Sequence, residues 1–134
     1  MFMKKPATSF ADARGEIVDL IESEEINAVT IVTFKKGAVR GNHFHKETTQ
    51  WNYVISGRLA LHTELPPDVR REVEVVTGDL VMLVPNERHA FVALEDTMLA
   101  VFTKGPRGGK EYEIDTFRIE PPLVDPTRKQ DSLR

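Results

Sequence analysis

The sequence predicts an all-β fold, a single-domain antiparallel jelly-roll barrel spanning residues 1–134. Short segments rich in Val, Ile, Thr and aromatic residues recur along the chain, and residues typical of turns separate them roughly every 8 to 12 positions. Hardly any segment shows the amphipathic pattern of a helix. A chain of 134 residues is long enough to bury one core, so no second domain is needed.

The predicted strands are short segments with many β-branched and aromatic residues. Polar residues, glycine or proline bound each segment, and these residues favour turns. In chain order the predicted strands are Glu16–Glu22, Asn27–Phe34, Gln50–Ile55, Arg58–Thr63, Arg70–Val76, Leu80–Val84, His89–Leu94, Met98–Thr103 and Tyr112–Ile119.

Glycine and proline mark the predicted connections. Ser56-Gly57 suits a tight hairpin between two strands because glycine adopts positive φ without strain. The glycine-rich stretch 104–110 lacks the ending of a phosphate-binding loop and is interpreted as a connection. Residues 121–134 are polar and contain proline, so we expect a C-terminal extension that lies along the surface or packs on a partner subunit.

Composition narrows the function classes. With 40% hydrophobic residues, 29% charged residues and a net charge of −3, the chain is expected to be globular, and its basic residues form no cluster that would bind nucleic acid. The absence of cysteine excludes disulfides and thiolate metal sites. No apolar run is long enough for a membrane helix or a signal peptide, so we expect a cytoplasmic protein.

A pair of histidines, His43 and His45, is the strongest functional signal. Side chains at i and i+2 lie on one face of a strand, so both imidazoles can converge on one target. His89 follows the turn residues Pro85-Asn86. If the fold brings His89 beside the pair, the three imidazoles form a site for a divalent transition metal such as zinc, iron, nickel or manganese. The alternative is a pair of histidines on a solvated strand face.

The histidine pair also lies in a longer pattern that resembles the first motif of the cupin family. That motif is glycine, five residues, His-x-His, three or four residues, glutamate, six residues and glycine. Here the pattern consists of Gly37, His43, His45, Gln50 and Gly57. Every spacing fits, but glutamine replaces the glutamate that usually binds the metal.

The second cupin motif is matched in part. Counting from Gly78, the turn glycine of the family falls on Asn86, and the third histidine ligand falls on His89. The proline is displaced by one position to Pro85, and Ala93 stands where the motif ends in asparagine. Asparagine is a sensible replacement for the turn glycine because it tolerates left-handed backbone angles.

A narrower resemblance concerns cupins that isomerise or epimerise nucleotide-linked 4-keto-6-deoxy sugars, and the cupin domains of capsular-polysaccharide enzymes. It rests on the segments Phe10–Gly15, Arg40–Lys46 and Tyr112–Arg118. The resemblance implies a small-molecule substrate such as a nucleotide sugar, and a role in polysaccharide biosynthesis. The sugar ketoisomerases generally lack a histidine equivalent to His89, so its presence here favours a metal site over a metal-free histidine base.

Two amide side chains are expected in the barrel interior. Gln50 either coordinates the metal or hydrogen-bonds a liganding histidine. The loss of the usual carboxylate leaves the site more positive by one unit, which weakens cation binding but favours an anionic substrate oxygen. Asn52 lies on the same strand face as Gln50, and it either contacts substrate or water or makes a packing hydrogen bond.

The leading functional hypothesis is a sugar isomerase or epimerase. A metal held by the histidines would polarise the substrate carbonyl, and a base would remove the neighbouring proton to give an enediolate. The catalytic candidates are His43 or His45, if left off the metal, and Tyr112, if the C-terminal region covers the mouth. Arg40 and Lys46 would bind the diphosphate, unless they are merely solvated charges.

Two other functions remain open on the sequence alone. A three-histidine iron site with open positions would suit an Fe(II)-dependent dioxygenase. A chain that lacks the ligand carboxylate could instead be a non-catalytic cupin that binds a sugar or metabolite. In each case we expect a homodimer, because a barrel of this type exposes strand edges and an apolar outer face.

Overall fold

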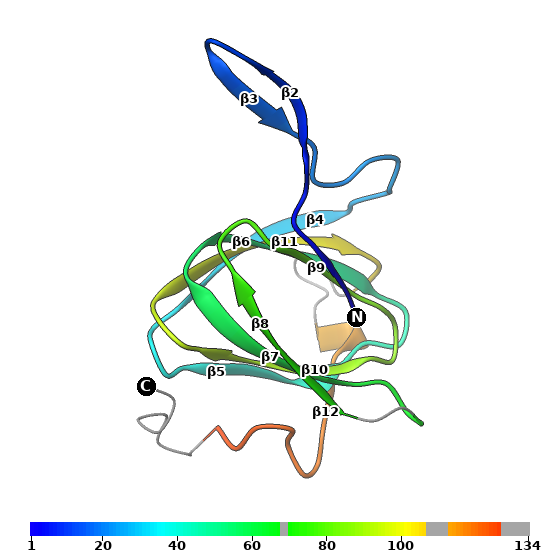
Figure 1. Cartoon of the computed structure of the whole chain (residues 1–134). Helices are drawn as coiled ribbons and strands as arrows, with labels where there is room; N and C mark the ends of the chain where they lie inside the picture. The colour runs from blue at the N-terminus through cyan, green and yellow to red at the C-terminus, as the bar shows by residue number, and fades with distance from the viewer. Residues whose placement is uncertain (68–69, 107–112, 127–134) are drawn as a thin grey trace.

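The computed structural model describes residues 1–67, 70–106 and 113–126. Two five-stranded sheets face each other and enclose the core, and a separate two-stranded hairpin extends from the barrel (Figure 1). Every strand pairing in the described residues is antiparallel. The predicted all-β jelly-roll fold is therefore confirmed.

The first sheet, called here the β6 sheet, has the strand order β1-β9-β6-β11-β4. Its central strand pairs with β9 on one side and β11 on the other, and β4 forms one edge of the sheet. The strands are β1 (Phe2–Lys4), β9 (Leu80–Leu83), β6 (Thr49–Ser56), β11 (Thr97–Lys104) and β4 (Ala28–Phe34).

The second sheet, called the β10 sheet, has the order β12-β5-β10-β7-β8. Its central strand pairs with β5 and β7, and the two-residue strand β12 continues the sheet beyond β5. The strands are β12 (Phe117–Arg118), β5 (Val39–Phe44), β10 (Arg88–Ala93), β7 (Arg58–Glu64) and β8 (Arg71–Val76).

The core lies between the two sheets and follows the period of two that strands impose. In β7 the residues Leu59, Leu61 and Thr63 are buried, while their neighbours are partly exposed. Val54 of β6 and Leu99 of β11 belong to the same buried cluster as the two leucines. The strands themselves were predicted from their β-branched and aromatic content and from the turn residues between them.

Seven of the predicted strands agree with the structure to within one residue at each end. The first is shorter than predicted: β3 covers Gly15–Val18 and pairs with β2 (Thr8–Asp12). The last prediction, Tyr112–Ile119, was wrong for much of its length, because residues 113–115 form a single 3₁₀ turn before β12. The predicted ranges omit β1 and β2, which are both exposed and lack an alternating burial pattern. They also omit β5 (Val39–Phe44), which was expected without bounds as the strand that carries His43.

The Ser56-Gly57 connection is a corner between the sheets, and the predicted hairpin was wrong. Strand β6 lies in one sheet and β7 in the other, so the two do not pair. Gly57 has a φ of 110°, and a Cβ atom at this position would lie 2.4 Å from Oγ1 of Thr97. Glycine therefore serves here as a sharp turn packed against β11.

The β2-β3 hairpin projects away from the barrel (Figure 1). Phe10 and Ile17 are paired across its two strands and are 53% and 57% exposed. A two-stranded hairpin alone is only marginally stable in water. Contacts beyond its own two strands are therefore expected to stabilise this hairpin.

The C-terminal segment covers the outer face of the β10 sheet over its described part. Val124 packs with Ala90 and Val92 in a second apolar cluster. The side chain of Asn42 fixes this segment through two hydrogen bonds: its Nδ2 donates to the Val124 carbonyl (2.8 Å) and its Oδ1 accepts from the Val124 amide (3.0 Å). Residues 127–134 of the predicted extension lie outside the described residues.

Among the described residues, none belongs to a helix that could cross a bilayer.

Candidate metal centre

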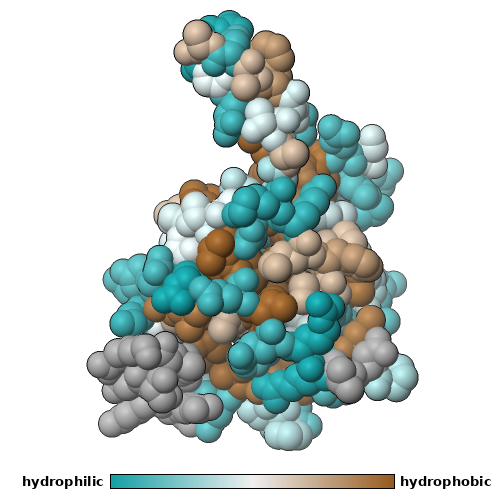
Figure 2. All heavy atoms as spheres, in the orientation of Figure 1, coloured by the Kyte–Doolittle hydropathy of each residue, from teal (hydrophilic) through white to brown (hydrophobic). Residues whose placement is uncertain are grey.

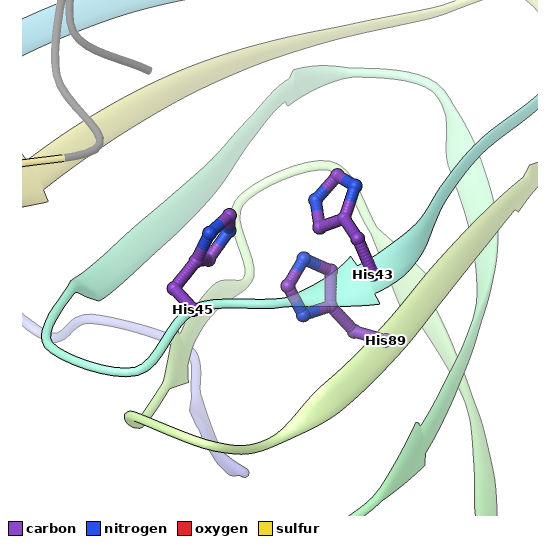
Figure 3. Close-up of side chains that lie close together, drawn as sticks. All are labelled: His43, His45 and His89. Atoms are coloured by element: carbon purple, nitrogen blue, oxygen red, sulfur yellow. The ribbon is translucent and has the colours of Figure 1, made fainter. Parts of the chain in front are cut away.

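Three histidines converge inside the barrel. The rings of His43 and His45 have centroids 4.9 Å apart, and His89 lies 4.7 Å from His43 and 5.4 Å from His45. One ring nitrogen from each residue lies within 4.8 Å of those of the other two. Figure 3 shows the three side chains pointing toward a common volume, His43 and His89 from neighbouring strands and His45 from the chain that follows β5. The fold thus brings His89 beside the pair.

Strand pairing and one close glycine contact explain this convergence. His43 of β5 lies directly opposite His89 of β10, and the register shifts between His89 and Ala90. Gly41 packs against this irregularity, with a φ of 103°. Any side chain at Gly41 would enter the space of the His89 carbonyl, so the register depends on glycine.

His45 lies just beyond the end of β5, not within the strand as expected. A turn from the other sequence motif holds it in place: the Asn86 amide donates to the His45 carbonyl at 2.6 Å. Asn86 has a φ of 69°, in the left-handed region, as its place at the glycine position of the motif suggested. The two motifs are therefore joined directly at the backbone.

The ring hydrogen bonds of two histidines fix which nitrogen carries the proton. Nδ1 of His45 lies 2.7 Å from the Asp115 carbonyl oxygen, and Nδ1 of His89 lies 3.1 Å from that of Glu87. A carbonyl oxygen only accepts, so Nδ1 must donate in each case. In the neutral rings Nε2 then carries the lone pair, which is the arrangement that metal-liganding histidines use. The donor set therefore fits a divalent transition metal.

The histidines border a cavity of about 250 Å³ between the two sheets. His43 and His89 line it directly, and His45 is buried with 3% of its surface exposed. Facing them across the cavity are apolar side chains and two amides. The further lining residues are Val32, Phe34, Arg40, Gly41, Gln50, Asn52, Phe91, Leu99, Val101 and Arg118.

Gln50 and Asn52 are both buried on the inner face of β6, as strand alternation predicted. Nδ2 of Asn52 donates a long hydrogen bond of 3.4 Å to the Val81 carbonyl, and the side chain also borders the cavity. Gln50 borders the same cavity from the sheet opposite the histidines. Both amides are thus available to a ligand.

The predicted phosphate-binding residues are placed differently from each other. Arg40 lines the cavity mouth, and its guanidinium donates to the Thr33 carbonyl at 3.2 and 3.1 Å. Lys46 is not among the residues that line the cavity; its ammonium group lies over the Phe117 ring, 4.4 Å from the centroid. Tyr112, the third catalytic candidate, lies outside the described residues.

Two residues near the site were missed by sequence reasoning. Arg118 lines the cavity beside Arg40, because β12 pairs with β5 and places Arg118 opposite His43. Asp115 is buried, with 3% of its surface exposed, and contacts His45 through its carbonyl. Both lie in the Tyr112–Arg118 segment, which supported only the narrower sequence resemblance to sugar-modifying cupins. The segment has no motif whose residue spacing would point to a functional residue.

The Asp115 carboxylate is held in its charged form. Burial raises the pKa of this group. Hydrogen bonds from the Glu47 amide, the Thr48 hydroxyl and the Lys46 amide, together with the nearby His45, lower the pKa by more than burial raises it. The net effect is a pKa below the ordinary value of 3.8. The charge belongs to the residue whose backbone carbonyl contacts the His45 ring.

Comparison with known proteins identifies the family. The model of the cupin domain family matches residues 30–103, more than half of the chain. The chain belongs to the cupin family. This confirms the resemblance inferred from the two motifs. No curated protein matches this cupin by sequence.

Solved structures share the fold of this cupin at low identity. QdtA, a sugar 3,4-ketoisomerase from Thermoanaerobacterium thermosaccharolyticum in complex with TDP, is 19% identical with a TM-score of 0.69, over 88% of this chain and 87% of that chain. The dTDP-4-dehydrorhamnose 3,5-epimerase from Sulfolobus tokodaii is 20% identical with a TM-score of 0.73, over 98% and 85%.

A third similar structure is a longer protein. The capsular polysaccharide assembling protein CapF from Staphylococcus aureus is 20% identical with a TM-score of 0.61, over 82% of this chain but 33% of CapF. The three proteins belong to the groups that the narrower sequence resemblance named. At these identities they establish a shared fold.

Proposed function

We propose that this cupin binds a divalent transition metal through His43, His45 and His89, and isomerises or epimerises a keto sugar or nucleotide-linked sugar in the cytoplasm. The observation that carries the proposal is the convergence of the three imidazoles, two of them with Nδ1 bonded to a backbone carbonyl, beside a cavity. The substrate class is supported by the similar fold of QdtA, of which a variant was solved with TDP-4-keto-6-deoxyglucose.

The metal would act as a Lewis acid that polarises the substrate carbonyl. Zinc, iron, nickel and manganese all accept imidazole ligands, so the donor set is compatible with each. Gln50 lies across the cavity and either completes the coordination through its amide oxygen or binds a substrate hydroxyl. Because no carboxylate belongs to this donor set, the bound site keeps the full charge of the ion, which favours an anionic oxygen on the substrate.

The polar and apolar walls would orient a sugar ring. Asn52 and Gln50 offer amide donors and acceptors for hydroxyl groups. Phe34 and Leu99 on the same sheet, and Phe91 on the facing sheet, supply apolar walls that exclude water. A cavity of about 250 Å³ suits a sugar ring, so a nucleotide would extend outside through the mouth. Arg40 at the mouth, joined by Arg118, would bind its phosphates, and Lys46 would require a rotamer change to do so.

The reaction needs a base that removes a proton next to the carbonyl and returns it at another carbon by way of an enediolate. Among the described residues that line the cavity, none is Asp or Glu. The base is therefore sought among the histidines and Tyr112. With all three histidines on the metal, Tyr112 is the candidate base. In an arrangement that leaves His43 off the metal, this ring, the most exposed of the three, would accept the proton at a nitrogen.

The test begins with elemental analysis of protein purified without a nickel column. We expect about one metal ion per chain in the wild type, and loss of most of it in His45→Ala with the fold intact. His62→Ala serves as the control, because His62 lies on β7 and is not part of the three-histidine group. Stoichiometric metal in the His45 variant would contradict the ligand assignment.

Turnover separates the functional alternatives. With TDP-4-keto-6-deoxyglucose in D2O, an isomerase or epimerase incorporates deuterium at the carbon next to the carbonyl, detected by NMR. Oxygen consumption by the Fe(II)-loaded protein would instead identify a dioxygenase. Sugar binding with a filled metal site, no deuterium exchange and no oxygen consumption would leave a binding protein and overturn the proposed reaction.

We also propose that the protein forms a homodimer through the outer face of the β6 sheet. Val29 and Ile31 on edge strand β4 are 63% and 57% exposed, and Ile55 and Met98 extend this apolar surface. Figure 2 shows hydrophobic residues reaching the surface of the barrel, and others on the projecting hairpin. A second copy would cover this face and support the hairpin, which has few contacts with its own barrel.

A further inference from the structure

The loop that follows His45 is tied to a segment about 70 residues further along the chain by a single carboxylate. Oδ1 of Asp115 accepts from the Lys46 amide at 2.9 Å. Oδ2 accepts from the Glu47 amide at 2.9 Å and from the Thr48 hydroxyl at 2.7 Å. Both carboxylate oxygens are thus used, and the three donors are the three residues that directly follow His45.

The same residue contacts the His45 ring through its backbone. Its carbonyl oxygen lies 2.7 Å from Nδ1 of His45, so this ring hydrogen bond depends on where the Asp115 backbone lies relative to the loop. The three hydrogen bonds that the side chain accepts set that position. A carboxylate that accepts three hydrogen bonds at 2.7 to 2.9 Å is a strong anchor for the loop.

We infer that Asp115 is a positioning residue: its carboxylate locks residues 46–48 so that its own carbonyl holds His45 in the Nδ1-protonated form, with Nε2 directed to the metal site. This inference rests on the proposed metal site. It adds a residue from outside both cupin motifs to the machinery of the centre. Asp115 would not touch substrate or metal, and would act through His45.

The arrangement at His89 shows a related device. Nδ1 of His89 lies 3.1 Å from the carbonyl of Glu87, another buried acidic residue, whose Oε1 accepts from the Val84 amide at 3.2 Å. There the acidic residue belongs to the same turn as the histidine. At His45 the acidic residue, Asp115, comes from a separate segment. Its substitution therefore tests the ring hydrogen bond without altering the residues next to His45 in the chain.

The primary experiment reads the His45 tautomer by long-range 1H–15N correlation NMR of the metal-free protein. In the wild type we expect the Nδ1-protonated form. In Asp115→Ala we expect a shift toward the Nε2-protonated form, because the carbonyl is no longer held against the ring. Asp115→Asn keeps one acceptor oxygen, so it should fall between the two.

The second readout is the affinity for Co²⁺, measured by competition with a chelator. We expect a loss of about 10- to 100-fold in Asp115→Ala, the range typical for residues that orient metal-liganding histidines. The matched control is Asp79→Ala. Asp79 is also a buried carboxylate that accepts a hydrogen bond from a backbone amide (Val76, 2.9 Å). It precedes β9 at the Leu80 end, whereas the other end of β9, at Leu83, pairs with Gln50 of the cavity.

The outcomes separate this inference from the proposed function. A wild type that binds no Co²⁺ would contradict the metal site, while the tautomer measurement would still test the role of Asp115. A wild-type His45 protonated at Nε2, or an Asp115→Ala variant with unchanged tautomer and affinity, would overturn the inference. If Asp115→Ala does not fold, Asp115→Asn and Thr48→Val carry the test, since each removes part of the anchor.

Discussion

Gly41 lies directly against the backbone of His89. A Cβ atom built on Gly41 would meet the His89 carbonyl oxygen at 2.9 Å and the Ala90 Cα at 3.1 Å. These distances are too short for the two strands to keep their present separation if any side chain is added. The position of His89, a candidate metal ligand, therefore depends on Gly41, although Gly41 has no side chain that could bind a metal or substrate.

Gly41→Ala is expected to disturb the metal centre as well as the fold. The strained φ and the clash with β10 should together cost about 1–3 kcal/mol of unfolding free energy, and the displacement of His89 should weaken metal binding. Gly15→Ala is the matched control, because Gly15 also has a positive φ of 136° but nothing lies within 4 Å of its Cβ position. Denaturant unfolding and metal titration measure both effects, and equal metal affinity in the two variants would contradict the contact-based explanation.

Gln50→Glu is expected to tighten metal binding. The substitution restores the carboxylate that the family motif usually has at this position, and adds one negative charge to a cavity that faces three imidazoles. We expect roughly tenfold higher affinity, about 1.4 kcal/mol, by chelator competition. Asn52→Asp adds the same charge on the same strand face two residues away. An equal gain in both variants would indicate a general charge effect in place of coordination by residue 50.

His62 should make the stability depend on pH. Burial lowers the pKa of His62 below its ordinary value of 6.5, and the Arg70 charge lowers it too, outweighing the Glu72 carboxylate 3.0 Å away. As pH falls below 6.5 the unfolded chain binds the proton before the folded one, so this contribution to stability is lost as pH falls through the folded pKa. His62→Gln should show a smaller drop in unfolding free energy between pH 7.5 and pH 5.5. A steeper drop would show that the Glu72 ion pair dominates.

Ile31→Glu is expected to dissociate the proposed dimer. The charge would lie on edge strand β4, within the exposed apolar face proposed to pair, where burying it against a second copy is costly. Light scattering at micromolar concentration should give the mass of two chains for the wild type and of one for the variant. Ile114→Glu, a matched change at a residue that is 66% exposed and lies away from this face, should remain dimeric. A wild type of single-chain mass would refute the dimer.

The sequence predicted most of the barrel because its strands are rich in β-branched and aromatic residues and are bounded by turn residues. The segment that became β7, for example, lies between Gly57 and the prolines Pro66 and Pro67. The convergence of the three histidines could also be anticipated, since the motif spacing and the left-handed Asn86 turn are local features. Composition and turn residues could not show that β6 and β7 lie in opposite sheets.

The supporting parts of the centre were not predictable from spacing. Asp115 is 70 residues from His45 in the chain, and its contact depends on where the 3₁₀ turn before β12 lies against the end of β5. Arg118 reaches the cavity for the same reason. A charged residue in a short irregular segment belongs to no repeating sequence pattern. Its role becomes visible only from its contacts in the folded structure.

The two amides and the three imidazoles stand on facing sheets, and their separation is set by the apolar side chains packed between those sheets. Trimming Leu99 or Val101 would therefore enlarge the room for a ligand while leaving every polar group in place. Variants of this chain with an unchanged ligand set should then accept molecules of different size, and residues with no chemistry of their own become the natural targets for redesigning selectivity.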